Sequence, residues 1–231
     1  MVQKKSKSAE GRRAPGRPRQ YDPDQALAKA AETFWKKGYA ATSLDDLVAA
    51  TGMQRPSLYA AFGDKQQLYL KTLERYQQRS RAMSLELLAD HPSLRVFLKR
   101  FYQAALDIYR TGGSDARGCY SISTAPAQAI TDSAVRDFLA ASIGGTDAFL
   151  RKQITRAQEQ GEVAANADAE ALAQLATATL HTIAVRSRVG VPRKQLMSIA
   201  AAAIDMICGP LVRQQADSQS GKSAGRALAR G

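Results

Sequence analysis

Apolar residues recur at helical spacing along most of the chain, from about Tyr21 to residue 210. Alanine is abundant, valine is scarce, and no alternation of apolar and polar positions persists long enough to indicate a strand. The pattern therefore predicts an all-α protein. The expected helices span about 22–37, 42–51, 54–61, 65 onward, 93–111, 115–126, 132–160, 168–189 and 193–209.

Capping residues and glycines mark the ends of the first helices. Asp22-Pro23 opens the first one, because aspartate caps a helix N-terminus and proline is tolerated in the first turn. Thr42-Ser43, followed by two aspartates, opens the second helix, and Gly52 ends it. About four residues around Gly52 join the second and third helices, which is the layout of a helix-turn-helix.

Nine apolar side chains of these three helices are spaced to form one small core. They are Leu27, Ala31, Phe34, Leu44, Leu47, Val48, Met53, Leu58 and Phe62. Four residues of the third helix are then left facing outward: Gln54, Arg55, Ser57 and Tyr59. Arginine and glutamine suit guanine and adenine edges, and hydroxyls suit phosphates, so the pattern favours DNA binding. A helical bundle that never touches DNA is the alternative, since four basic and five acidic residues give segment 21–63 a net charge of −1.

A family resemblance decides between these interpretations. The motifs are Phe34…Lys37-Gly38-Tyr39…Thr42-Ser43, Leu47…Gly52-Met53 and Ser57-Leu58-Tyr59…Phe62…Asp64-Lys65…Leu68. Through them, residues 16–70 resemble the N-terminal domain of the TetR/AcrR family of transcriptional regulators. The rest of the chain is similar to the family in layout, and Arg117-Gly118-Cys119 is similar to a subset of it. The resemblance implies a helical C-terminal domain that dimerises and encloses a cavity for a small-molecule effector.

The resemblance also implies how DNA is held. A homodimer would read two half-sites about 34–36 Å apart in a palindromic operator, and the effector would release it. Thr42 and Tyr59 would donate hydrogen bonds to phosphates. Lys65 would add a charge at a helix N-terminus, where backbone N–H groups already favour an anion.

Base edges would be met by Gln54, Arg55 and Ser57. Glutamine is a poor N-cap, and Pro56 compensates by fixing the backbone of the first turn. The complete set of expected DNA-binding residues is Arg17, Arg19, Thr42, Ser43, Gln54, Arg55, Pro56, Ser57, Tyr59 and Lys65.

The formal net charge of +12 is concentrated at the two ends of the chain. Seven basic residues and one acidic residue give segment 1–20 a net charge of +6, and four basic residues and one acidic residue give segment 213–231 a net charge of +3. Both ends carry few large apolar residues, so we expect disorder there. The expected organisation is a basic arm (1–20), a helix-turn-helix domain (21–66), an effector-binding and dimerisation domain (67–210) and a basic tail (211–231).

Within the arm, Gly16-Arg17-Pro18-Arg19 resembles an AT-hook, an extended segment that lies in an A·T-rich minor groove. An untailored basic tail is the alternative. An architectural protein that binds DNA through its tails, without an effector, is a further possibility for the whole chain.

The last two expected helices carry dense apolar stripes with many alanines, which suit either an internal core or a dimer seam. Most of the aromatic and special residues near the expected cavity are expected to be simple core residues, and any of them could contact a ligand. They are Phe101, Tyr102, Tyr109, Cys119, Tyr120, Phe138 and His181. Cys119 is also a candidate redox or electrophile sensor, if exposed and if Arg117 favours its thiolate. Simple packing in the core is the alternative for Cys119. We expect Cys208 to pack at or near the dimer seam. We expect His181 to be a buried polar residue whose hydrogen bonds are made within the core.

Other function classes are disfavoured. No apolar run approaches the roughly 18 residues of a membrane span, and no hydrophobic segment follows the basic N-terminus, so we expect a cytoplasmic protein without a membrane partner. Two cysteines and two histidines in no cluster predict neither a disulfide framework nor a metal site, and no cofactor is implied. An enzyme using Cys119 and His181 lacks a third group to orient the pair, so no catalytic residues are expected. We expect a repressor that a small-molecule effector releases from its operator, although the sequence does not decide between repressor and activator.

Overall fold

The computed structural model describes residues 22–110 and 117–209, and this part of the chain is entirely helical. Its helices are α1 (Pro23–Lys37), α2 (Leu44–Thr51), α3 (Arg55–Phe62), α4 (Lys65–Glu86), α5 (Leu94–Tyr109), α6 (Tyr120–Gln128), α7 (Ser133–Glu159), α8 (Ala169–Arg188) and α9 (Arg193–Cys208). The all-α prediction is confirmed, and most helix ends lie within two residues of the expected positions. The expected basic arm and basic tail lie outside the described residues.

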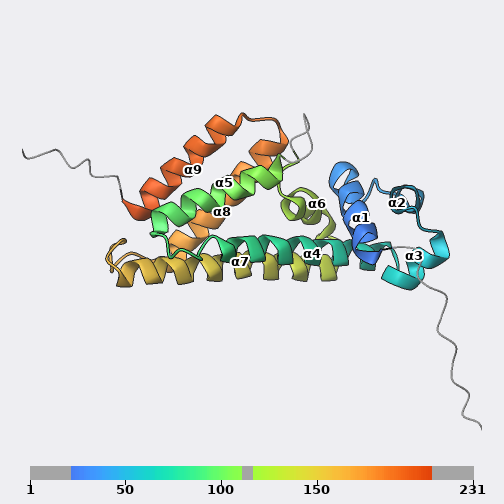
Figure 1. Ribbon diagram of the computed structural model, residues 1–231, viewed down its shortest axis with the longest axis horizontal. Helices are drawn as coiled ribbons and strands as arrows, with labels where there is room; N and C mark the ends of the chain where they lie inside the picture. Colours follow the sequence, from blue (N-terminus) through green and yellow to red (C-terminus); the bar gives the residue numbers. More distant parts are fainter. Residues whose placement is uncertain (1–21, 111–116, 210–231) are drawn as a thin grey trace, which may run out of the picture.

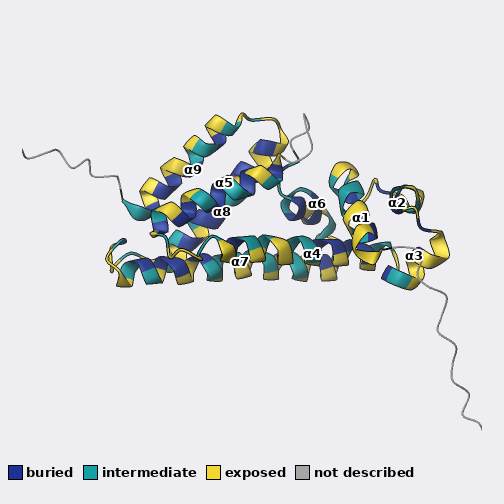
Figure 2. Cartoon of the chain, viewed as in Figure 1, coloured by how far each residue is buried: buried dark blue, intermediate teal, exposed yellow. Residues whose placement is uncertain are grey.

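The molecule is elongated, with α1–α3 at one end and α5, α8 and α9 at the other (Figure 1). The long helices α4 and α7 run along its length and join the two ends. The short helix α6 lies between them, packed against α1, α4, α7 and α8. Buried positions face inward on α5 and α8, while the outer faces are exposed (Figure 2).

Helix α6 departs from the sequence-based expectation of a helix over 115–126 that ends at Ala125-Pro126. It begins at Tyr120 and continues through Pro126 to Gln128. A proline inside a helix removes one backbone hydrogen bond, here the one to the carbonyl of Ile122. The ladder resumes at once, because the N–H of Ala129 donates to Ala125. Packing on four neighbouring helices stabilises a segment that local propensity alone would end.

Two apolar cores lie along the molecule. The nine side chains expected to form the small core all belong to the first cluster, either buried or packed against it. This cluster also includes Leu68, Tyr69 and Leu73 of α4, together with Tyr120 of α6 and Val135 of α7. The second cluster fills the space between α5, α7, α8 and α9. The first half of α4 therefore packs in the small core of the helix-turn-helix, and a domain boundary at residue 66 stays a prediction.

Candidate nucleic-acid interface and ligand cavity

Helix α3 presents a polar outer face. It begins after Gln54, whose side chain makes no capping hydrogen bond, and Pro56 occupies its first turn. Leu58 and Phe62 are buried in the first core and so fix which side of the helix faces outward. The residues that this leaves exposed are Gln54, Arg55, Pro56, Ser57 and Tyr59. The expectation that Gln54, Arg55, Ser57 and Tyr59 face outward is confirmed.

The turn before α3 is held by its own backbone. Gly52 adopts a left-handed conformation, with φ 71° and ψ 10°, and its N–H donates to the carbonyl of Val48. Such a conformation favours glycine, because a Cβ would clash with the backbone. Thr51 donates to the carbonyl of Leu47 at 2.7 Å, and Met53 is 4% exposed. The angle between α2 and α3 is thus set by glycine geometry and by one buried methionine.

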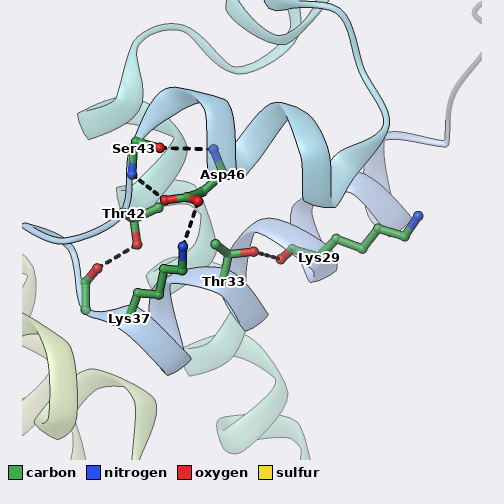
Figure 3. A network of polar contacts seen from close by, with 7 residues as sticks. Lys29, Thr33, Lys37, Thr42, Ser43 and Asp46 are labelled. Carbon is green, nitrogen blue, oxygen red and sulfur yellow. Dashed lines mark hydrogen bonds and ion pairs between the residues drawn. The ribbon is translucent and has the colours of Figure 1, made fainter.

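The joint between α1 and α2 is held by Asp46 (Figure 3). Ser43 and Asp46 form a capping box, in which each side chain accepts a hydrogen bond from the other's backbone N–H. Lys37 of α1 lies 2.6 Å from Asp46 Oδ1. Mainly through Lys37, these contacts lower the pKa of Asp46 to about 2. Ser43, expected to bind DNA, is exposed, but its hydroxyl already serves as the cap.

Thr42 does not have the role that the sequence suggested. Its side chain is fully buried, and its hydroxyl donates to the carbonyl of Gly38 at 2.6 Å (Figure 3). A phosphate oxygen accepts hydrogen bonds and therefore needs a free O–H, which Thr42 lacks. The prediction of a direct phosphate contact by its hydroxyl is wrong for this structure. Thr42 instead fixes the turn that leads into α2.

Two cations lie at the two ends of α3: Arg55 is its first residue, and Lys65 follows its last residue by three positions. Arg55 forms an ion pair with Asp45 at the start of α2, and this carboxylate raises the pKa of Arg55. Lys65 is the first residue of α4, whose N-terminus is capped by Asp64. Its Nζ lies 4.4 Å from the centroid of the Tyr39 ring, and partial burial lowers the pKa of Lys65. Both side chains are therefore positioned by neighbours, which the sequence did not reveal.

A cavity of about 720 Å³ lies between α4, α5, α6, α7 and α8. Four of the seven residues expected there line it: Phe101, Tyr109, Cys119 and His181. The other three do not. Tyr102 is buried and donates to the carbonyl of Ala176 at 3.0 Å, the Tyr120 hydroxyl lies 2.7 Å from Thr72 Oγ1, and Phe138 packs against the first core.

Much of the cavity wall was missed by the sequence analysis. It comes from one side of α4 and one side of α7, and it includes Gln77, Ser80, Arg81, Ser84, Lys152, Gln153 and Arg156. Polar residues on long amphipathic helices are typical of a solvent-facing surface, so no signal distinguished these positions.

Cys119 lines the cavity but is not an activated thiol. Burial raises its pKa, and its Sγ accepts a hydrogen bond from the Tyr76 hydroxyl at 3.5 Å. The guanidinium of Arg117 does not favour the thiolate as proposed from the sequence. It pairs with Glu32 and lies over the Trp35 ring, 5.9 Å from the ring centroid. The expectation of a low-pKa thiol promoted by Arg117 is wrong.

His181 lines the same cavity as Cys119. Burial lowers the pKa of His181, and the nearby carboxylate of Asp147 acts in the opposite direction. No hydrogen bond joins the imidazole to the thiol in the described part of the chain. The two residues share a wall without forming a nucleophile–base pair.

Helix α6 connects this cavity to the helix-turn-helix. Cys119, Ser121 and Ile122 line the cavity, while Tyr120 and Thr124 face α4. The Tyr69 hydroxyl of α4 donates to Thr124, and Trp35 Nε1 of α1 donates to the carbonyl of Arg117 just before α6, at 3.2 Å. Gln66 at the start of α4 donates to Asp132, the N-cap of α7. Helix α6 therefore contacts the cavity with one side and the small core with the other, so a change in the cavity wall can reach the small core through this single helix.

Sequence comparison gives the family. The profile described as "Bacterial regulatory proteins, tetR family" matches residues 26–72, and "Tetracyclin repressor-like, C-terminal domain" matches residues 97–203. The chain is 31% identical to the HTH-type transcriptional repressor ComR of Escherichia coli over 186 residues, or 80% of this chain and 88% of that protein. The chain belongs to the TetR family.

Two further TetR proteins extend the comparison. The repressor BdcR of Escherichia coli is 34% identical over 149 residues, covering 63% of this chain and 75% of that protein. A cysteine-substituted variant of the regulator CifR, solved in complex with 26-bp double-strand operator DNA, is 32% identical with a TM-score of 0.73. The match covers 82% of this chain and 98% of that one.

The described part of this TetR chain contains neither a membrane-spanning helix nor a cluster of metal-binding side chains. Within 22–110 and 117–209, none of the helices is long and apolar enough to cross a membrane. Over the same residues, no cluster of three or more His, Cys, Asp or Glu side chains is arranged to hold a metal ion.

Proposed function

We propose that this TetR-family chain is a homodimeric repressor that binds a palindromic operator and leaves it when a small molecule fills the cavity. The observation that carries the proposal is the exposed polar face of α3, presented by the Gly52 turn at one end of an elongated molecule. The names of ComR and BdcR as repressors, and the operator complex of CifR, support it.

In the proposed complex, α3 lies in the major groove. Gln54, Arg55 and Ser57 meet base edges, and Tyr59 donates to a phosphate. Lys65 adds a charge at the N-terminus of α4, where backbone N–H groups favour a phosphate. Ser43 and Pro56 shape the backbone around these groups. Arg17 and Arg19, which lie outside the described residues, add minor-groove or phosphate contacts.

The proposed dimer forms through α8 and α9. Large apolar side chains are exposed on these helices and at the C-cap of α8, with Val185 54%, Val189 75% and Met206 70% exposed. Exposed apolar groups of this size gain free energy when a second copy covers them. A two-fold pair of α3 helices would then read half-sites about 34–36 Å apart.

Release of DNA would follow from the position of α6. Along this short helix, residues that line the cavity alternate with residues that contact α4. A ligand that favours one position of α6 favours one position of α4 and hence one spacing of the two α3 helices. The ligand can lower operator affinity at most by the ratio of its own affinities for the DNA-binding and the released conformation.

A second candidate is a regulator that senses oxidants or electrophiles through Cys119. The observation that favours it is that the thiol lines the cavity beside Tyr76. Its raised pKa argues for a slow reaction that depends on the binding of an electrophile in the cavity, rather than for a reactive free thiolate.

Operator selection from random DNA, followed by footprinting of the full chain, tests the main proposal. We expect an enriched palindrome with two protected half-sites. Deletion of residues 1–19 should keep sequence preference and make the dependence of log K on log salt shallower. Loss of nearly all binding in that deletion would instead support an architectural protein that binds through its tails. Enrichment of no palindrome would contradict the proposal.

A further inference from the structure

The walls of the cavity carry positive but no negative side chains. Arg81 from α4, and Lys152 and Arg156 from α7, are lining residues, whereas no aspartate or glutamate is. Arg81 and Lys152 are exposed and so mark the mouth, and Arg156 is half-buried. A cavity with charge of one sign and partly apolar walls concentrates ligands of the opposite sign.

These three cations lack carboxylate partners. No ion pair involves any of them in the described part of the chain, although Arg151, on the neighbouring position of α7, pairs with Glu170 at 3.4 Å. Cations of the same domain such as Arg95 and Arg193 also pair with aspartates. Asp147 lies near His181, and Glu159 lines a neighbouring pocket together with Lys152 and Arg156. Neither carboxylate forms an ion pair with the three lining cations in the described part of the chain.

Two buried polar groups on the wall also lack partners. Gln153 is 9% exposed and Ser121 is 5% exposed, and both line the cavity. Neither the amide of Gln153 nor the hydroxyl of Ser121 forms a hydrogen bond with the rest of the described chain. Their polar atoms are not among the fully buried, unpaired ones of the described chain, so both are open to the cavity and available to a polar atom of a ligand.

The two lining cations of α7 lie at the end of the cavity that is far from the helix-turn-helix. Val135, near the start of α7, packs in the small core next to the helix-turn-helix, so Lys152 and Arg156 lie about five to six turns further away along α7. Leu139 and Cys119 line the end nearer to the helix-turn-helix. Phe101, Phe149 and Leu180 add apolar wall between α5, α7 and α8.

We infer that the cavity takes an amphiphilic anion, with its carboxylate or phosphate held by Arg156 and Lys152 and its apolar body extending toward Cys119. Gln153 donates its amide N–H to the same anion or to a polar atom next to it. The volume of about 720 Å³ is within the range of roughly 300–1,000 Å³ that is typical of sites for drug-sized ligands. The inference rests on the proposed function and names the chemical class of its effector.

The test is calorimetric titration of the full-length chain, without DNA, with four ten-carbon probes below their micelle concentrations. They are decanoate, decyl phosphate, decanol and decyltrimethylammonium. We expect one or both anions to bind at least tenfold more tightly than decanol, and the cation to bind weakest. The preferred anion identifies the head group. Equal binding of decanol, tighter binding of the cation, or no binding of either anion would overturn the inference.

Charge substitutions on α7 locate the head group. Arg156→Gln should weaken binding of the preferred anion by about tenfold and leave decanol binding unchanged, which also shows that the variant is folded. Arg151→Gln, at the adjacent but paired cation, is the matched control and should bind like the original chain. If both substitutions weaken the anion equally, the effect is one of general charge and the assigned site is wrong.

Operator binding, measured separately by fluorescence anisotropy, distinguishes failure of this inference from failure of the proposed function. If the chain binds its operator and the bound anion does not weaken that complex, the ligand class stands and the proposed release is wrong. If the chain releases its operator with decanol or the cation instead, release stands and the ligand class is wrong.

Discussion

The hydroxyl of Tyr69 on α4 donates a hydrogen bond to Thr124 Oγ1 on α6 across 2.7 Å, and both side chains are buried. Tyr69 also packs edge-on against Phe34 of α1. One tyrosine therefore contacts both the small core and the helix that forms a wall of the cavity. Burial raises the pKa of Tyr69 to about 12, so this hydroxyl stays a donor at all physiological pH values.

Substitutions at this pair test whether the contact carries the coupling. Tyr69→Phe should lower the free energy of unfolding by about 1 kcal/mol, and Thr124→Val by about 1–3 kcal/mol because it leaves a buried hydroxyl unpaired. The double variant should be destabilised by less than the sum of the two. Urea unfolding gives the stabilities, and anisotropy gives the effect of effector on operator affinity, which should shrink in each variant.

A control separates this contact from the loss of a threonine hydroxyl in general. Thr33 on α1 donates only within its own helix, to the carbonyl of Lys29. Thr33→Val should leave the ratio of operator affinities with and without effector unchanged. Additive destabilisation in the Tyr69/Thr124 double variant would show that the two residues are not coupled.

Gly118 gives a second prediction. Its φ is +67°, and a Cβ at this position would lie 2.5 Å from the carbonyl oxygen of Ala184 on α8. Gly118→Ala combines a left-handed backbone cost of about 1–2 kcal/mol with a clash against backbone that cannot move freely. Gly161→Ala is the matched control, because Gly161 has φ +72° and open space around its Cβ position. In thermal unfolding, we expect Gly118→Ala to lower the Tm clearly more than Gly161→Ala. Equal losses would mean that α8 accommodates the methyl group.

Local signals in the sequence predicted the first three helices well. Asp22, Ser43 and Gly52 act within a few residues of their own positions, so the ends of α1 and α2 follow from the sequence without knowledge of the fold. The exposed face of α3 followed as well, because burial of Leu58 and Phe62 at helical spacing leaves the remaining positions outward.

The cavity wall and the contacts between the two cores could not be predicted in this way. Tyr102 and Tyr120 are aromatic residues of the kind that often line cavities, but the hydroxyl of each points to a neighbouring helix instead. Arg156 is a residue type that is usually found on the surface, and only the packing of α4 beside α7 places it on a cavity wall. The pair Arg117–Glu32 joins residues 85 positions apart, a distance over which periodicity carries no information.

The ion pair between Arg55 and Asp45 leads to a prediction about DNA affinity. Asp45 holds Arg55 in the free protein and adds a negative charge beside the proposed groove contact. Asp45→Asn should tighten operator binding several-fold, because it releases Arg55 and removes repulsion from phosphates. Arg55→Ala should weaken binding by about 1–3 kcal/mol and relax specificity at one base position of each half-site. Anisotropy with the selected operator and with single-base variants measures both effects. An unchanged base preference in Arg55→Ala would remove Arg55 from the set of base-reading residues.

Lys65 is expected to contribute charge rather than sequence preference. Burial lowers the pKa of Lys65 in the free protein, and a phosphate nearby would raise it again because it favours the charged ammonium. Lys65→Gln should weaken binding to all sequences alike and reduce the salt slope by about 1 per protomer. Lys99→Gln, at an exposed position on α5, is the control and should not alter the slope. A changed base preference with an unchanged slope would contradict a phosphate contact by Lys65.

The thiol of Cys119 provides the last prediction. Burial raises the pKa of Cys119 above its ordinary value of 9.0, so the thiolate fraction at pH 7 is smaller than that of a free cysteine. Alkylation by iodoacetamide should therefore be slow at neutral pH and should accelerate as the pH rises beyond 9. The experiment uses Cys208→Ser, since the other thiol also has a raised pKa, of about 11. Mass spectrometry of the alkylated chain across pH gives the rates. A rate that reaches its plateau below pH 8 would mean that an unburied or activated thiolate is present, and would return the oxidant-sensing candidate to first place.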